Sequence, residues 1–423
     1  MVVITIAIAA CSIPATRSLS IIASRPFDAS YVMVGGQNGT WFGPGQAPRL
    51  EKIELGNYSV TPLTPVPTEG TVWGGGFNGS QWLISGWGED NGPNGSDPYI
   101  FLYDGNRQVI GGSLNQYQAE TTWHGGDIFA ASSNGKEWLL SGLGSGNLTS
   151  YGDINHMSLS MFDGNNFRDL SSSVPHQQDA ILYANAWNGK YWLVGGGYDD
   201  FGILFSFDGK KIVNLTPAIA QAVQSFGSVQ SLAWNGYYWL IGGEDFLAMY
   251  DGYRVTDLTS KLDAVLQLNY NCCSSVNAIA WDGIEWVLGG GTPVAELDYS
   301  YAWLAKYAGG EFTDLSRKIS PNGTDLVPTS SILSISASGG SWIIGGYIGS
   351  RGALYEYNGQ SFTNLSHLVT GYTYVNWVGA LLVRKHGPTI ARPDSVAFGE
   401  TDIFLLSLDA LRLVEVRPRA LPV

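Results

Sequence analysis

The residues with the clearest chemical potential in this sequence are asparagines followed two positions later by serine or threonine. Asn-x-Ser/Thr is the acceptor pattern for N-linked glycosylation of secreted proteins. The pattern occurs at Asn38, Asn57, Asn78, Asn94, Asn147, Asn214, Asn322 and Asn364. We expect Asn78 in a hairpin turn and Asn94 in a long loop, where a glycan fits readily. Pro217 directly follows the pattern at Asn214 and makes it a poorer acceptor. Together these sites predict an extracellular, glycosylated protein.

Thiol chemistry is limited to three cysteines, Cys11, Cys272 and Cys273. An odd number with one vicinal pair is neither a disulfide framework nor a set of zinc ligands. Three arrangements stay open: a vicinal disulfide between Cys272 and Cys273, a bond from one of them to Cys11 of the same or another chain, and free thiols in a loop.

Acid–base and metal chemistry have little support in the sequence. The histidines show no metal-ligand spacing, and no Gly-x-Ser-x-Gly nucleophile elbow is present. We therefore predict no catalytic, cofactor-binding or metal-binding residue. The net charge is −14, and lysines and arginines are scattered rather than clustered. Nucleic acid is excluded as a partner on this ground, because its binding rests on clustered cations.

The N-terminal stretch 2–10, VVITIAIAA, is apolar but too short to span a bilayer, and no Lys or Arg precedes it. We expect residues 1–17 to form an N-terminal apolar strand or a remnant signal segment. Such a strand could pair with a sheet edge of its own molecule or of a second copy, which would make the protein a homo-oligomer. No other stretch is long and apolar enough for a membrane span.

The elements that would position these residues are built from a repeat. Three of its copies read AWNGKYWLVGGG (186–197), AWNGYYWLIGG (233–243) and AWDGIEWVLGGG (280–291). One tryptophan recurs at the same place in each copy. The aligned tryptophans are Trp82, Trp138, Trp192, Trp239, Trp286 and Trp342. Because each stands in an apolar strand, we expect the rings to fill the space between neighbouring sheets rather than to stack on a sugar.

A second motif follows each copy, for example SFDGKKIVNL at 206–215. Asn-Gly or Asp-Gly between apolar runs is typical of hairpins with type I′ turns, in which both central residues have positive φ. Asn188-Gly189 and Asp208-Gly209 thus close two successive hairpins. Four antiparallel strands in about 50 residues match one blade of a β-propeller.

We therefore predict an all-β fold, a β-propeller of about eight four-stranded blades. Seven blades plus a C-terminal extension is the alternative. Residues 18–419 show no linker or composition shift and are expected to form a single domain. The expected blades are approximately 18–67, 71–117, 126–175, 181–220, 228–264, 275–320, 331–370 and 372–419. The last is degenerate, with its first two strands expected within 374–385.

The second strand of each unit, which ends in Gly-Gly, resembles the kelch and galactose-oxidase-like propeller repeats. Kelch repeats usually carry a tryptophan in the last strand, whereas here it stands in the second and the last strand ends in Asp/Asn-Leu-Ser/Thr. The copper-binding set of the oxidase has no counterpart. The resemblance thus implies architecture and carries no activity. The composition also fits a secreted surface protein of archaeal type.

These observations predict a non-catalytic, extracellular or surface-displayed glycoprotein that acts as a binding or assembly module. It would be a component of a filament, surface layer or virion appendage, or a propeller that binds a glycan or protein. One alternative is a secreted carbohydrate-active enzyme with acidic residues in the central channel, which would require a pair of carboxylates about 5–10 Å apart. Another is an intracellular scaffold of the kelch type, in which the glycosylation patterns would stay unmodified.

Overall fold

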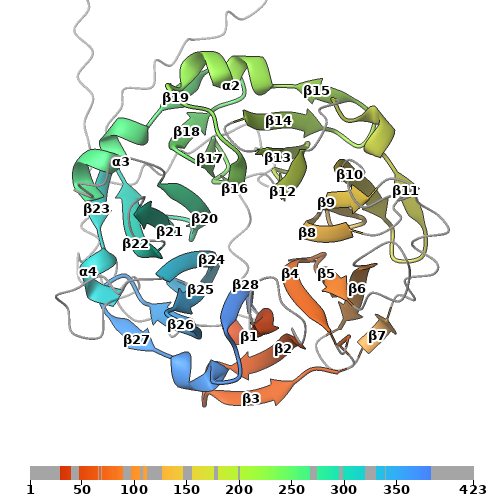
Figure 1. The fold of residues 1–423 in the computed structure, drawn as a ribbon, viewed down its shortest axis with the longest axis vertical. Helices are drawn as coiled ribbons and strands as arrows, with labels where there is room; N and C mark the ends of the chain where they lie inside the picture. Colours follow the sequence, from red (N-terminus) through yellow and green to blue (C-terminus); the bar gives the residue numbers. More distant parts are fainter. Residues whose placement is uncertain are drawn as a thin grey trace, which may run out of the picture. The chain divides into compact units, whose positions relative to one another are not determined.

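The computed structural model describes residues 29–39, 47–64, 66–67, 69–88, 97–104, 108–111, 126–145, 155–175, 180–198, 201–266, 274–294, 299–319, 330–338 and 340–382. The described strands form seven four-stranded antiparallel sheets, which Figure 1 shows as blades around one axis. The chain divides into two compact units, Met1–Val383 and Arg384–Val423, and every described strand lies in the first. Within the described residues, no helix is long and apolar enough to cross a membrane.

Six blades each use four strands that follow one another in the chain, from the innermost to the outermost. Blade 2 contains β4 (Gly70–Phe77), β5 (Trp82–Gly88), β6 (Asp97–Tyr103) and β7 (Gln108–Gly111). Blade 3 contains β8 (Gly126–Ser133), β9 (Trp138–Ser145), β10 (Asn155–Phe162) and β11 (Phe167–Asp169). Blade 4 contains β12 (Ile181–Trp187), β13 (Trp192–Tyr198), β14 (Phe201–Phe207) and β15 (Ile212–Asn214).

The other consecutive blades follow the same plan. Blade 5 contains β16 (Val229–Trp234), β17 (Trp239–Gly243), β18 (Phe246–Tyr250) and β19 (Val255–Asp257). Blade 6 contains β20 (Ser275–Trp281), β21 (Trp286–Val294), β22 (Tyr299–Ala308) and β23 (Glu311–Asp314). Blade 7 contains β24 (Ser330–Ser338), β25 (Ser341–Ile348), β26 (Arg351–Tyr357) and β27 (Phe362–Asn364). Short helical segments follow the outermost strands of blades 3 to 7: η1 (Ser171–Ser173), α2 (Thr216–Ala222), α3 (Thr259–Leu266), α4 (Ser316–Ile319) and η2 (Ser366–Val369).

Blade 1 is composite and closes the ring. Its innermost strand, β28 (Tyr374–Leu382), comes from the C-terminal side of the described chain and pairs antiparallel with β1 (Ala29–Asn38). The blade is completed by β2 (Ala47–Glu54) and β3 (Ser59–Pro62). Because β28 also contacts the innermost strands β24 and β4 of the flanking blades, the ring of seven is continuous.

The predicted count of eight blades is therefore wrong, and the alternative of seven is correct. The stretch 374–382 forms one continuous strand rather than the first hairpin of an eighth blade, because it contains no Asn-Gly or Asp-Gly turn. It supplies the inner neighbour of β1 instead. The beginning of the predicted first blade, 18–28, and the remainder of the predicted eighth blade, 383–419, lie outside the described residues.

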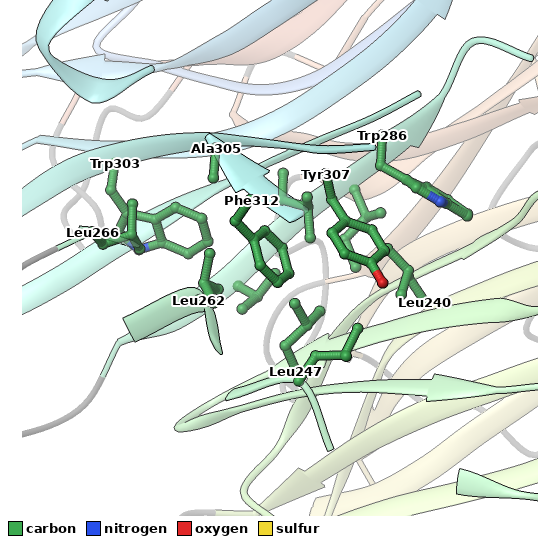
Figure 2. Close-up of a cluster of buried hydrophobic side chains, with 13 residues drawn as sticks. Leu240, Leu247, Leu262, Leu266, Trp286, Trp303, Ala305, Tyr307 and Phe312 are labelled. Carbon is green, nitrogen blue, oxygen red and sulfur yellow. The ribbon is translucent and has the colours of Figure 1, made fainter. Parts of the chain in front are cut away.

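The core lies between the blades. All six aligned tryptophans are buried. Figure 2 shows Trp286 and Tyr307 of blade 6 in one apolar cluster with Leu240 and Leu247 of blade 5. The second strand of each blade, such as β13, is buried on both faces, which explains why its sequence is continuously apolar instead of alternating. Large aromatic rings thus fill the wedge between neighbouring sheets.

The glycine pairs at the ends of these strands allow neighbouring blades to approach closely. A Cβ atom on Gly242 would lie 2.5 Å from Cγ1 of Val276, on the innermost strand of the next blade. Gly195 of blade 4 has the same relation to Val229 of blade 5. Glycine is needed at these places because a side chain would collide with the adjacent sheet.

Candidate functional site: the turn face of the propeller

The two ends of each blade differ in how the strands are connected. In a four-stranded meander, the first and third connections lie at one end and the second connection lies at the other. We call the end with the tight first and third turns the turn face, and the opposite end the loop face. Trp239, at the start of β17, contacts the first turn of the preceding blade, since its Nε1 donates to Tyr191 Oη at 3.2 Å, and Trp286 Nε1 likewise donates to Tyr238 Oη at 3.4 Å. The blades therefore run in the same direction around the ring.

The first turn of each of blades 2 to 6 is fixed by an asparagine or aspartate side chain. In blade 4, Oδ1 of Asn188 accepts the backbone N–H groups of Lys190 and Tyr191, both at 2.9 Å. In this turn only Gly189 has a positive φ, at 96°. Among the described residues the sole non-glycine residues with positive φ are Tyr58 and Asp245, so Asn188 does not have one. The predicted type I′ geometry is thus wrong. Glycine occupies the first central position, as in type II′ hairpins, and the Asn side chain stabilises the turn from the preceding position.

The third connection repeats this chemistry with aspartate. Oδ1 of Asp208 accepts N–H groups of Lys210 and Lys211 at 2.8 and 2.7 Å. The same bonds occur at Asp163 and Asp251. These backbone hydrogen bonds hold the pKa of each of the three carboxyl groups below its usual value. Their charge is consequently directed at the turn backbone.

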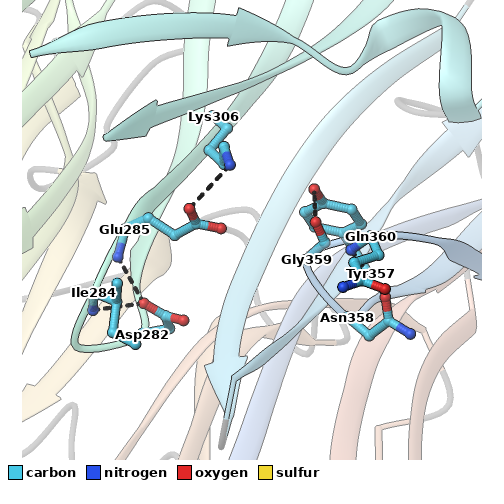
Figure 3. A network of polar contacts seen from close by, with 8 residues as sticks. All are labelled: Asp282, Ile284, Glu285, Lys306, Tyr357, Asn358, Gly359 and Gln360. Carbon is cyan, nitrogen blue, oxygen red and sulfur yellow. Dashed lines mark hydrogen bonds and ion pairs between the residues drawn. The ribbon is translucent and has the colours of Figure 1, made fainter. Parts of the chain in front are cut away.

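Figure 3 shows two further turns of this face. Asp282 accepts the N–H groups of Ile284 and Glu285 at 2.8 Å each, and the Glu285 carboxylate forms an ion pair with Lys306 at 3.1 Å. In blade 7, the Tyr357 hydroxyl donates to the carbonyl oxygen of Gly359 at 2.7 Å. The turns are therefore rigid supports rather than adaptable loops.

The side chain at the third position of these turns is not required by the turn geometry and extends into solvent. It is Tyr237 in the first turn of blade 5, Tyr253 in the third connection of blade 5 and Ile284 in the first turn of blade 6. These side chains are 81%, 99% and 78% exposed, respectively. They are the most exposed large apolar residues among those the structure describes. Two adjacent blades thus present three apolar side chains on one face.

Cations flank these apolar side chains on blades 4 and 5. Lys190 lies in the first turn of blade 4, Lys210 and Lys211 lie in its third connection, and Arg254 follows Tyr253. All four are exposed. We call the seven residues together the turn-face patch. It consists of Lys190, Lys210, Lys211, Tyr237, Tyr253, Arg254 and Ile284. The sequence analysis did not predict this patch, although Tyr237, Tyr253 and Ile284 each directly follow an Asn-Gly or Asp-Gly pair in the sequence.

The innermost strands carry a second repeated feature, a shift in register at equivalent positions of all seven blades. In blades 2 to 4, Trp73, Phe129 and Tyr183 lie at this shift, and successive ring centroids are 5.3 Å apart. In blades 5 and 6 the equivalent residues are Gln230 and Asn277. None of these side chains is acidic. The described residues also contain no group of three or more His, Cys, Asp or Glu that could hold a metal ion.

Two of the predicted glycosylation sites belong to a structural motif of the blades. Asn364, at the end of β27, accepts the Ser366 N–H at 2.9 Å, and Ser366 Oγ in turn accepts the Leu354 N–H at 3.1 Å. Asn214 and Thr216 make the same contacts with Leu204. Aspartate occupies the first position in three other blades. These equivalents are Asp169, Asp257 and Asp314.

The other predicted site residues fall in different environments. The side chains of Asn38 and Asn57 are exposed. Asn78 is half-buried in the first turn of blade 2, where Oδ1 accepts the N–H groups of Ser80 and Gln81. The remaining predicted residues lie outside the described part of the chain. They are Asn94, Asn147, Asn322, Cys11, Cys272 and Cys273.

These sheets define the chain as a seven-bladed β-propeller. No protein-family model and no curated protein matches it. Among solved structures, it is similar to the β-propeller domain of the Trilobed protease from Pyrococcus furiosus, with 10% identity over 80% of this chain and 95% of that one, and a TM-score of 0.43. An acylaminoacyl peptidase in complex with Z-Gly-Gly-Phe-chloromethyl ketone matches at 11% identity over 81% and 51% of the two chains, with a TM-score of 0.46. The Pyrococcus horikoshii acylaminoacyl peptidase matches at 10% identity over 80% of this chain and 53% of that one, with a TM-score of 0.45.

These similarities are too distant to carry an argument about this chain. The β-propeller class is confirmed by the sheets, whereas membership of the kelch or galactose-oxidase-like group stays a prediction.

Proposed function

We propose that this propeller is a non-catalytic binding or assembly module of a surface-displayed or secreted glycoprotein, and that it binds its partner through the turn-face patch. The observation that carries this proposal is the exposure of Tyr237, Tyr253 and Ile284 at equivalent turn positions of adjacent blades. Exposed apolar residues are common singly, but several on one face of a rigid support mark interaction sites. Tyrosine contributes strongly to binding because its ring offers a large contact area at a low entropic cost.

The structure of the support favours recognition. Each exposed side chain stands on a turn whose backbone is held by an Asx side chain, as Asp251 holds the turn that carries Tyr253. Little backbone entropy is then lost when a partner binds. Arg254 directly follows Tyr253, and Lys210 lies in the equivalent turn of blade 4, so cations accompany the apolar residues on this face, as polar groups do at the rim of a protein interface.

The extracellular location rests on the low proportion of charged residues, 14%, and on the glycosylation patterns. Asn38 and Asn57 are exposed, so a glycan can be attached without disturbing a blade. Intact-mass measurement of native material is expected to exceed the polypeptide mass. A mass equal to the bare chain would remove this support for an outside location.

The binding role is tested with the double variant Tyr237→Ser/Tyr253→Ser. Its matched control is Val213→Ser, which alters an exposed apolar side chain on the outer strand β15. Both proteins and the wild type are applied to a glycan array and examined by mass photometry over a range of concentrations. We expect at least one saturable association that the double variant weakens by about tenfold or more and the control leaves unchanged. Equal association by the double variant and the wild type would contradict the proposal.

A further inference from the structure

The two ends of blades 4 and 5 differ in charge. At the loop face of blade 5, Glu244 and Asp245 join β17 to β18, and α3 carries Asp263 and Lys261. The tight turns at the opposite end of the two blades carry four cations, Lys190, Lys210, Lys211 and Arg254. These turns also contain Asp208 and Asp251, which accept backbone N–H groups of their own turns. The turn face of these two blades therefore has an excess of cations, and the described loop face of blade 5 has an excess of carboxylates.

Backbone hydrogen bonds hold the acidic connection of blade 5 at the loop face in place. The connection between β17 and β18 consists of Glu244 and Asp245. The Glu244 N–H donates to the Ser228 carbonyl and the Asp245 N–H donates to the Ser274 carbonyl, both at 3.0 Å. Burial raises the pKa of Asp263 on α3, and the nearby carboxylate of Asp245 raises it further. Carboxylates from two elements thus lie together on this part of the loop face.

Exposed aromatic residues accompany this acidic region. Tyr198 and Phe201 end β13 and begin β14 at the loop face of blade 4, and they are 51% and 48% exposed. We call the residues Tyr198, Phe201, Glu244 and Asp245 the loop-face patch. Blades 4 and 5 therefore carry a basic and aromatic patch on one face and an acidic and aromatic patch on the opposite face.

We infer that the partner of the turn-face patch is a second copy of this chain, bound head to tail through its loop-face patch. This inference rests on the proposed function and names the partner of the same site. Stacking along the axis brings Lys210 and Arg254 of one copy toward Glu244 and Asp245 of the next, with aromatic side chains on both sides.

Charge complementarity selects this orientation over the others. The chain carries a net charge of −14, so two copies repel one another in most orientations. Contact between two turn-face patches or between two loop-face patches opposes like charges, which costs free energy. Only the head-to-tail arrangement opposes the two unlike patches. Because such an interface is heterologous, it propagates into a filament unless a rotation closes it into a ring.

The inference is tested with two variants of the full chain. The turn variant is Lys210→Glu/Arg254→Glu, and the loop variant is Glu244→Gln/Asp245→Asn, in which Asn tolerates the positive φ of residue 245. Tyr198→Ser/Phe201→Ser is a second loop variant that preserves every charge. We expect the wild type to form concentration-dependent oligomers in sedimentation velocity, weakened by raising the salt from about 0.05 to 0.5 M. Each variant alone should weaken self-association at least tenfold with an unchanged melting temperature.

Mixing the variants reveals the geometry of the interface. The turn variant keeps an intact loop face and the loop variant keeps an intact turn face, so an equimolar mixture should form 1:1 dimers and no longer species. The charge-matched control Arg317→Glu/Lys318→Glu changes two exposed cations on α4, which lie at the loop-face end of blade 6 outside the loop-face patch, and should not weaken association.

Several outcomes would overturn the inference. A wild type that stays monomeric at all concentrations and low salt excludes self-association. If that monomer still binds a glycan through Tyr237 and Tyr253, the proposed function stands and only the identity of the partner is wrong. A loop variant that dimerises as well as the wild type would indicate contact between two turn faces, and a mixture without dimers would exclude head-to-tail pairing.

Discussion

Blade 5 and blade 1 have the same four-stranded sheet but are specified in different ways. Blade 5 is built from consecutive residues, Val229–Asp257, and carries the repeated Trp239, two Asx-Gly turns and the Asp-Leu-Thr motif. Blade 1 joins β28 to β1 from opposite ends of the described chain. Its turn at 55–58 has no Asx-Gly pair and places Tyr58 at a φ of 57°.

The difference teaches that residues close in sequence can determine a blade, whereas closure of the ring depends on contacts between distant segments. In blade 5 each turn, strand end and buried ring is determined by residues close in sequence. In blade 1 the stabilising contacts reach across the closure, as when the Tyr58 hydroxyl donates to Glu356 of blade 7 at 3.2 Å. Contacts between distant segments cost more loop-closure entropy, so closure is expected to be the last and least redundant step of folding.

The largest expected effect comes from removing the closing strand. Deletion of 374–423 removes β28, whose buried Val375 and Val378 pack in a cluster with Val32 and Val34 of β1. It also exposes the edge of β1 and the side of blade 7. We expect a loss of more than about 5 kcal/mol of unfolding free energy, or loss of cooperative unfolding, in urea denaturation followed by tryptophan fluorescence. Deletion of 384–423 is the control, because it retains β28; equal stability of the two truncated chains would contradict the role of closure.

A smaller loss is expected within a consecutive blade. Trp192→Ala removes a buried ring between blades 3 and 4 and should cost about 3–5 kcal/mol through lost transfer energy and cavity formation. Tyr253→Ala is the matched control, since its almost fully exposed ring should change stability by less than about 0.5 kcal/mol. Urea denaturation of both variants measures the difference. A similar cost for the two substitutions would mean that the rings between blades do not provide the core.

The strand-end hydroxyl distinguishes the two kinds of blade more finely. In blade 6, Ser316 Oγ accepts the Leu304 N–H at 3.1 Å and is buried. Ser316→Ala leaves this N–H without its acceptor and should cost about 1–3 kcal/mol. In blade 1, Leu63 repeats the backbone bond to Leu50 at 2.9 Å, but the following Thr64 is exposed. Thr64→Ala should therefore be nearly neutral when both variants are compared by urea denaturation, and an equal cost at both positions would remove this distinction.

The smallest expected effect is on the stability of the fold at acidic pH. Asp163, Asp208 and Asp251 have lowered pKa values because turn N–H groups donate to their carboxylates. A carboxyl with a lower pKa in the folded state stabilises the fold above its unfolded pKa of about 4, and this stabilisation is lost as pH falls through the folded value. The variant Asp208→Asn retains the acceptor oxygen without titrating, as Asn358 does in blade 7. We expect it to reduce the loss of melting temperature between pH 5 and pH 2, measured by circular dichroism; an unchanged or greater loss would contradict the assignment.

Much of the fold was predictable because the consecutive blades repeat their local signals. The Asx-Gly pairs located the hairpins, and the aligned tryptophans located the second strands of blades 2 to 7. The turn type was predicted wrongly because an Asn-Gly pair fits both the central positions of a type I′ turn and the first two positions of the observed turn. The pair alone does not reveal that Oδ1 of Asn188 accepts two N–H groups.

The ring closure and the turn-face patch were not predictable from local sequence. Residues 374–382 resemble the innermost strand of any blade, and nothing nearby indicates that their partner is β1. The exposed Tyr237 and Tyr253 follow Asx-Gly pairs, where turn geometry permits almost any residue. Their significance appears only when the ring places adjacent turns on one face.

The strand-end motif has a consequence for how this protein can diverge. Asp169, Asp257 and Asp314 are each followed by leucine and then serine or threonine. Codons for aspartate and asparagine differ by a single base, so one mutation would create a new glycosylation pattern at any of these places. The fold would tolerate the change because the Oδ1 of Asn364 already accepts the same N–H group as an aspartate does, leaving its Nδ2 available for a glycan. The outer rim of the propeller can therefore gain and lose glycosylation patterns by point mutation without any change in its architecture.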